Sequence, residues 1–140
     1  MAQLDIPEFL LETPYNGTHY PGAKHTNGLK GGANCQQFAY ELLRYFGKSI
    51  PNFRSSNLWE DTTYTKQVEE PFEPLDLLLW HKHLDSYGAH VGIYIGQQYV
   101  IHLAKHIGKP VIWNLEQFPL EDRYKYFIGA KRLTAKIKDE

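Results

Sequence analysis

The second half of the sequence is a succession of strand-like segments, and this feature limits the fold more than any other. Apolar and other residues alternate over residues 90–95 and 99–103, whereas residues 77–80 form a continuous apolar run. Residues 110–113 and 126–130 raise the expected number of strands to about five. One helix precedes them, because apolar residues recur at helical spacing over about residues 35–46, between Asn34 as N-cap and Gly47. A helix followed by consecutive strands predicts an α+β fold with an antiparallel sheet.

Length and composition are those of one small globular domain. The 140 residues include 42% hydrophobic and 22% charged residues, with no repeat and no linker, so we expect a single domain over residues 1–140. Residues 13–34 are rich in Gly, Pro and Asn and predict a long surface loop, whereas residues 55–59 predict a short helix. The single cysteine, Cys35, excludes an intrachain disulfide bond.

Charge and targeting signals bear on partners and compartment. The net charge of −1 gives no reason to expect a nucleic acid or a membrane as partner. The one basic cluster is interpreted as a solvated strand end and tail, and it consists of Lys131, Arg132, Lys136 and Lys138. The sequence shows neither a signal peptide nor an apolar run of membrane-spanning length. We therefore expect a soluble protein that is cytoplasmic or exported by a route other than Sec, of unknown oligomeric state.

Cys35 begins the predicted helix and is a candidate nucleophile. A helix N-terminus carries partial positive charge and free backbone N–H groups, which favour the thiolate and can hold an oxyanion. On a helical wheel, Cys35 lies on the apolar face of the helix and therefore points toward the sheet. The alternative is that Cys35 is a small, buried, apolar side chain without a chemical role.

His90 and His102 lie in neighbouring predicted strands that are joined near residues 96–98. A two-residue turn at residues 96–97 would place the two side chains on opposite faces of the sheet. A three-residue loop would place them on one face, as direct or diagonal neighbours. In that second arrangement one imidazole takes the thiol proton and the other orients it. The alternative is two unrelated histidines with structural roles.

Several motifs together resemble those of the NlpC/P60 cysteine peptidases. The segment Asn-Cys-Gln-Gln-Phe-Ala-Tyr at residues 34–40 resembles the nucleophile motif, and residues 74–80 resemble a strand that usually begins Gly-Asp-Leu. The segment His-Val-Gly-Ile-Tyr-Ile-Gly at residues 90–96 resembles the motif of the base, and His102 follows His90 by the usual twelve residues. Residues 126–132 resemble the closing strand, so the resemblance covers about residues 14–133.

The resemblance implies a papain-like fold in which the catalytic helix packs on the antiparallel sheet. It also implies that Cys35 is the nucleophile, that His90 is the general base and that His102 orients His90. The implied reaction is hydrolysis of an amide through a thioester, without a metal or other cofactor. The implied substrate is a peptide or muropeptide, and the usual bond lies between D-glutamate and a diamino acid in the stem peptide of peptidoglycan.

Residues close to Cys35 have implied roles in oxyanion or substrate binding. The family often has a tyrosine that borders the oxyanion site, and Tyr15 matches its segment best, with Tyr20 as the second choice. Asn34 and Gln36 flank the nucleophile and are expected to border the same site.

Two departures from the family pattern leave other functions open. Asn34-Cys35-Gln36-Gln37 replaces the usual Asp-Cys-Ser-Gly, and Leu75 stands where glycine is usual before Asp76. The alternatives are a cysteine amidase or acyltransferase with a substrate outside the cell wall, and a non-catalytic domain that binds ligands in the same cleft.

The remaining histidines and tryptophans are expected to be structural. His81 and His83 could share a face of a strand, but no further ligand stands at a recognised metal-site spacing, so a solvated strand end is favoured. Three further histidines are expected in surface loops without partners: His19, His25 and His106. The tryptophans are assigned to core packing, with an aromatic-walled groove as the alternative: Trp59, Trp80 and Trp113.

Overall fold

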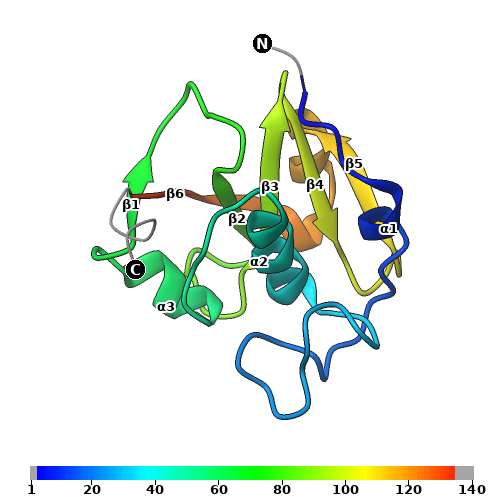
Figure 1. Cartoon of the computed structure of the whole chain (residues 1–140). Helices are drawn as coiled ribbons and strands as arrows, with labels where there is room; N and C mark the ends of the chain where they lie inside the picture. Colours follow the sequence, from blue (N-terminus) through cyan, green and yellow to red (C-terminus); the bar gives the residue numbers. More distant parts are fainter. Residues whose placement is uncertain (1–2, 135–140) are drawn as a thin grey trace.

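The computed structural model describes residues 3–134 and has an α+β architecture built on one antiparallel sheet (Figure 1). The sheet has six strands in the order β1-β6-β2-β3-β4-β5. The strands are β1 (Thr65–Val68), β2 (Leu77–His81), β3 (His90–Gly96), β4 (Tyr99–Leu103), β5 (Pro110–Asn114) and β6 (Tyr126–Leu133). The helices are α1 (Glu8–Leu11), α2 (Cys35–Tyr45) and α3 (Ser55–Glu60), with the 3₁₀ turns η1 (Leu115–Leu120) and η2 (Asp122–Tyr124).

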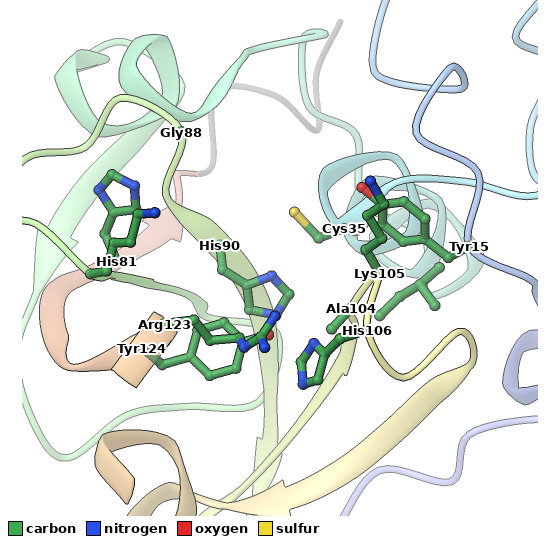
Figure 2. Close-up of a pocket in the computed structure, with 12 residues that line it drawn as sticks. Tyr15, Cys35, His81, Gly88, His90, Ala104, Lys105, His106, Arg123 and Tyr124 are labelled. Atoms are coloured by element: carbon green, nitrogen blue, oxygen red, sulfur yellow. The ribbon is translucent and has the colours of Figure 1, made fainter. Parts of the chain in front are cut away.

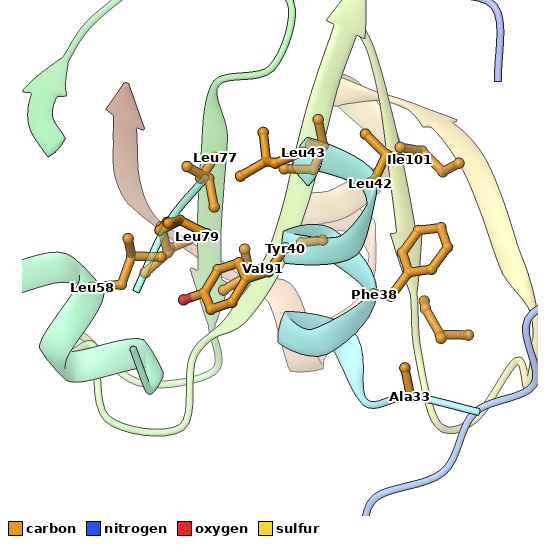
Figure 3. Close-up of a cluster of buried hydrophobic side chains, with 14 of the residues drawn as sticks. Ala33, Phe38, Tyr40, Leu42, Leu43, Leu58, Leu77, Leu79, Val91 and Ile101 are labelled. Carbon is orange, nitrogen blue, oxygen red and sulfur yellow. The ribbon is translucent and has the colours of Figure 1, made fainter. Parts of the chain in front are cut away.

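Helix α2 forms where the apolar periodicity predicts it, and its two ends have the expected signals. Asn34 caps the N-terminus, because its Oδ1 accepts a hydrogen bond from the backbone N–H of Gln37 at 2.8 Å. At the other end Gly47 has a φ of +84°, the left-handed conformation that ends many helices. The apolar face of α2 meets β2, β3 and β4, and Figure 3 shows Leu42 and Leu43 turned toward them. Each of these buried leucines contributes roughly 1.5–3 kcal/mol through apolar burial.

The sheet is covered on both faces, which explains the continuous apolar run in β2. Leu77 and Leu79 belong to the cluster beneath α2, whereas Leu78 and Trp80 belong to a second cluster on the opposite face. The 3₁₀ turns cover that second face through Phe118, whose ring stacks on Trp80 with centroids 3.8 Å apart. Trp80 therefore packs in the core, as expected, and it also lines a cavity with Phe72 and Phe127, which fits the alternative of an aromatic-walled groove.

The hairpin between β3 and β4 places His90 and His102 on one face by a route that differs from the expected loop. The turn has two residues, Gln97 and Gln98, and Gly96 pairs with Tyr99. A bulge between Tyr94 and Gly96 then shifts the register by one residue, so that Ile93 pairs with Ile101. With this shift His102 stands opposite Gly92, as a diagonal neighbour of His90 on the same face.

The end of β6 corrects the interpretation of the basic cluster. Lys131 is 1% exposed, and its Nζ donates to the carbonyl oxygens of Trp59 and Asp61 at the C-terminal end of α3. Arg132 donates from Nε and Nη2 to the carboxylate of buried Asp76 at 2.8 and 2.9 Å. These two side chains join β6 to other elements and are not a solvated strand end; Lys136 and Lys138 lie outside the described residues.

Strand β1 and residue Leu75 are further differences from expectation. Strand β1 is an edge strand that pairs with β6, and it makes the sheet six-stranded where about five strands are expected. Leu75 has a φ of +79°, so a leucine adopts the left-handed conformation at the position where the resemblance has glycine. Over residues 3–134 no helix combines the length and apolar character needed to cross a membrane.

Candidate active site

The N-terminus of α2 and the start of β3 meet at a cavity of about 260 Å³. Cys35, the first residue of α2, lines this cavity together with His90, the first residue of β3 (Figure 2). Val91, Ile93 and Ile95 point to α2, so His90 belongs to the opposite face of the sheet. The two residues line one cavity because it lies at the end of the sheet, where a side chain from either face can reach it.

The surroundings of Cys35 hold it as a thiol in the free protein. Burial raises the pKa of the Cys35 thiol, and this effect exceeds the opposing effect of the N–H groups of Val91, Gln36 and Cys35 itself. The N–H groups of the helix N-terminus thus favour the thiolate, as expected, but desolvation outweighs them. The same N–H groups remain close to the sulfur, where they can stabilise negative charge that develops during a reaction.

His90 and His102 form a hydrogen-bonded pair, with 2.8 Å between His90 Nε2 and His102 Nδ1. Gly92, opposite His102, permits close approach of the two strands, since a Cβ atom there would lie 2.7 Å from Val100 Cγ1. Burial, followed by the nearby charges of His102, His106 and Arg123, holds the pKa of His90 well below 6.5. Burial also lowers the pKa of His102 to about 3. Both rings are thus neutral at neutral pH.

Aromatic rings enclose this histidine pair. The ring of Tyr124 stacks on His90 with centroids 4.7 Å apart, and Trp113 and Phe118 lie 4.5 and 4.8 Å from His102. His102 Nε2 is buried without a hydrogen-bond partner among residues 3–134. The tryptophan at position 113 therefore packs against the site.

Tyr15, and not Tyr20, lies beside Cys35. A bridge between Tyr15 and Ala33 holds the loop against the start of α2, and Tyr15 lines the cavity. Burial, with a further contribution from Cys35, raises the pKa of the Tyr15 hydroxyl. The ring of Tyr20 instead lies 4.4 Å below the guanidinium of Arg54. Of the two tyrosines that the sequence offers for this place, only Tyr15 thus lies next to Cys35.

Asn34 and Gln36 line a second cavity of about 450 Å³ on the other side of Cys35. Their polar atoms also serve the fold: Asn34 Oδ1 caps α2, and Gln36 Nε2 donates to the Phe53 carbonyl at 3.3 Å. Gln37 Nε2 donates to the Gly28 carbonyl at 3.0 Å. The two glutamines that replace smaller family residues thus tie two loops to the first turn of α2.

Basic residues absent from the sequence-based site also line the first cavity. They come from the end of β2 and the residue after it, from the segment after β4 and from η2, and they are His81, Lys82, Lys105, His106 and Arg123. His106 is therefore not the partnerless loop residue expected, and its Nε2 lies 4.0 Å from a carboxylate oxygen of Glu121. The periodicity of the sequence carries no signal for these residues, because all but His81 lie outside the strands.

The potential metal ligands do not form a cluster. His81 Nδ1 lies 3.1 Å from the backbone carbonyl of Asp85, and its ring meets that of His83 edge to face. Across residues 3–134, no three side chains of His, Cys, Asp or Glu are grouped to hold a metal ion.

Comparisons with known proteins agree with this arrangement. No curated protein sequence matches the chain significantly. An NlpC/P60 family protein from Bacillus cereus has a similar structure, with a TM-score of 0.56 and 20% identity over 73% of this chain and 32% of that one. The chain thus spans about a third of that protein's length. The NlpC/P60 domain of the peptidoglycan hydrolase SagA gives a TM-score of 0.53 and 21% identity over 79% of this chain and 85% of that one.

These identities show a shared fold. Family membership rests on the sequence profile of the NlpC/P60 family, which matches residues 15–125, most of the chain. Members of this family are generally hydrolases of cell-wall peptidoglycan. By this match, the chain belongs to the NlpC/P60 family.

Proposed function

We propose that the protein is a cysteine hydrolase that cleaves the bond between D-glutamate and a diamino acid in the stem peptide of peptidoglycan. The observation that carries the proposal is the meeting of Cys35 and His90 at one cavity, with His90 Nε2 2.8 Å from His102 Nδ1. Family membership supports a peptidase or hydrolase, and SagA, which shares the fold, is a peptidoglycan hydrolase.

The tautomers of the histidine pair follow from the environment of His102. Its Nε2 is buried without a hydrogen-bond partner among aromatic side chains, where an N–H is more favourable than a lone pair because it can point at the negative face of a ring. With that proton on Nε2, His102 Nδ1 accepts a hydrogen bond from His90 Nε2–H. His90 Nδ1 is then unprotonated and serves as the base.

The reaction has two balanced steps. His90 Nδ1 takes the thiol proton of Cys35, the sulfur bonds to the amide carbon, and the C–N bond breaks while the leaving nitrogen receives that proton. Backbone N–H groups at the start of α2 and the Tyr15 hydroxyl stabilise the oxyanion. A water molecule then gives one proton to His90 and attacks the thioester. The C–S bond breaks, the product acid leaves, and the thiolate recovers the proton.

A stem-peptide assay tests this proposal. The protein is incubated with L-alanyl-γ-D-glutamyl-diaminopimelate and with purified muropeptides, and new amines are quantified. We expect turnover that Cys35→Ser abolishes and His90→Ala reduces by about 10²- to 10⁴-fold. Equal turnover in the wild type and in Cys35→Ser would overturn the proposal.

The first turn of α2 favours one second candidate, a cysteine amidase with another substrate. Gln36 and Gln37 anchor loops at the positions where the family has small residues, and Gln36 also lines the cavity on that side of Cys35. Two results together would separate this candidate from the first. Alkylation of Cys35 by iodoacetamide would depend on His90, but the protein would cleave no muropeptide. These results would favour the amidase.

A further inference from the structure

The wall of the first cavity is rich in cationic groups. Lys82, Lys105 and Arg123 line it together with His106, and none of the residues that line it is an aspartate or glutamate. In Figure 2, Arg123 and His106 lie next to His90, and Lys105 lies on the Tyr15 side of the cavity. This local excess contrasts with the net charge of −1 for the whole sequence. Partial burial and the charge of Arg123 lower the pKa of His106, so the fixed cations are the two lysines and the arginine.

One carboxylate lies behind this wall without cancelling it. Glu121 Oε1 is 3.8 Å from Arg123 Nε and 4.0 Å from His106 Nε2, but Glu121 does not line the cavity. Within residues 3–134, neither Lys82 nor Lys105 has a carboxylate oxygen within 4.0 Å of its Nζ, the distance that defines the ion pairs found. The positive charges of Lys82 and Lys105 therefore act on a ligand in the cavity without neutralisation by a paired carboxylate.

The chemistry of the proposed function decides which half of the substrate meets this wall. The leaving nitrogen receives its proton from His90, so the amine half of the substrate lies on the His90 side of Cys35. The acyl half lies toward the second cavity, which the first turn of α2 lines. Arg123, which lies next to His90 in Figure 2, thus faces the amine half.

We propose that Arg123 binds a carboxylate on the amine half of the substrate, and that Lys105 and Lys82 add positive charge to the same cavity. This inference rests on the proposed function and adds a specificity: a leaving group with a free carboxylate is preferred over the same group as a carboxamide. An arginine can bind a carboxylate through two N–H groups, whereas a lysine acts as a point charge.

Two alkylating reagents test the wall without a substrate. Iodoacetate and iodoacetamide differ in charge, and in both cases the sulfur of Cys35 forms a C–S bond while iodide leaves. Both reagents react with the same thiolate, so the ratio of their rate constants does not depend on the thiolate fraction. Dividing by the same ratio for 2-mercaptoethanol removes the intrinsic difference in reactivity between the two reagents. Since Cys35 is the only cysteine, the readout has one source. We expect iodoacetate to be favoured several-fold at low salt, and less at high salt.

Charge variants should lower or raise this ratio according to the charge that they remove. Lys105→Gln and Arg123→Gln should each lower it by about two- to fivefold, whereas Glu121→Gln should raise it. Lys66→Gln is the matched control, because Lys66 is exposed in β1 and does not line the cavity. With stem peptides that carry a carboxylate or a carboxamide on the diamino acid, Arg123→Gln should lose most of the selectivity while still cleaving the amidated peptide.

These measurements distinguish failure of the carboxylate site from failure of the proposed function. A ratio equal to that of 2-mercaptoethanol and unchanged by all four variants would overturn the carboxylate site, even in an active hydrolase. Iodoacetamide alkylation that does not depend on His90, together with absent turnover, would overturn the proposed function instead.

Discussion

At the scale of single residues, His102 has the most unusual environment of the site. It is 1% exposed and lies among the rings of Trp113, Phe118 and Tyr124, and within residues 3–134 its side chain makes one hydrogen bond, to His90. A histidine in such a place stays neutral over a wide pH range, because the charged form would lose its hydration. A neutral His102 can hold His90 in one tautomer. The same burial makes the protein less stable in acid.

We expect His102 to make the protein less stable as the pH falls from 7 to 5. Its pKa is about 3 in the folded protein and roughly 6.5 in the unfolded chain, so the unfolded state binds the proton first. The stability is therefore present above pH 6.5 and is lost as the pH falls toward 3, by about 2 kcal/mol between pH 7 and 5. Urea unfolding at both pH values should show a smaller loss in His102→Gln, which retains His90. Equal losses in the two proteins would contradict this assignment.

Tyr15 is the second residue whose placement makes a sharp prediction. It lines both cavities next to Cys35, so its hydroxyl can stabilise an oxyanion. We expect Tyr15→Phe to lower kcat about 10- to 100-fold with little change in KM. Tyr20→Phe is the control, since Tyr20 lines neither cavity and lies against Arg54. A larger kcat loss in Tyr20→Phe would reverse the two assignments.

At the scale of elements, α3 docks on β6 through one glycine. Gly129 has a φ of +148°, and a Cβ atom there would lie 2.3 Å from Cη2 of Trp59. The indole therefore lies directly on the backbone of β6, and Lys131 Nζ holds the end of the same helix. We expect Gly129→Ala to lower the free energy of unfolding by about 2–4 kcal/mol.

A double-mutant cycle separates the two causes of that loss. In a Trp59→Ala background the steric cause disappears, so adding Gly129→Ala should cost only the backbone strain, about 1–2 kcal/mol. Denaturant unfolding of the four proteins provides the cycle. Additive losses would show that the contact between Trp59 and Gly129 is not the source of the effect.

The elements with strong periodicity could be predicted from the sequence, and those without it could not. Helix α2 and strands β3 and β4 have apolar residues at helical or alternate spacing in the sequence, so their pattern identifies them. Strand β1 has the sequence Thr-Lys-Gln-Val and buries only Thr65, because it owes its conformation to pairing with β6. The same reasoning applies to the site. Motifs identify Cys35 and His90, whereas Arg123 and Tyr124 belong to a short 3₁₀ turn that has no periodic sequence pattern.

At the scale of the whole molecule, one buried ion pair joins β6 to the start of β2. Asp76 is 1% exposed and accepts hydrogen bonds from Arg132 and from the backbone N–H of Glu73. The side chain of Arg132 is 23% exposed and also lies 3.2 Å from a Glu73 oxygen. The pair is therefore asymmetric: the carboxylate depends on its partners, whereas the guanidinium can regain water.

This asymmetry predicts unequal effects of removing either partner. We expect Asp76→Ala to lower the free energy of unfolding by about 3 kcal/mol, because it strands the partly buried guanidinium and a backbone N–H. Arg132→Ala should cost more than that, since it leaves a fully buried carboxylate with one remaining donor. The double variant should cost less than the sum of the two, because neither charge is left alone. Urea unfolding measures all three. Strict additivity would mean that the two charges stabilise the fold independently, and the link between β2 and β6 would then have to come from the strand pairing alone.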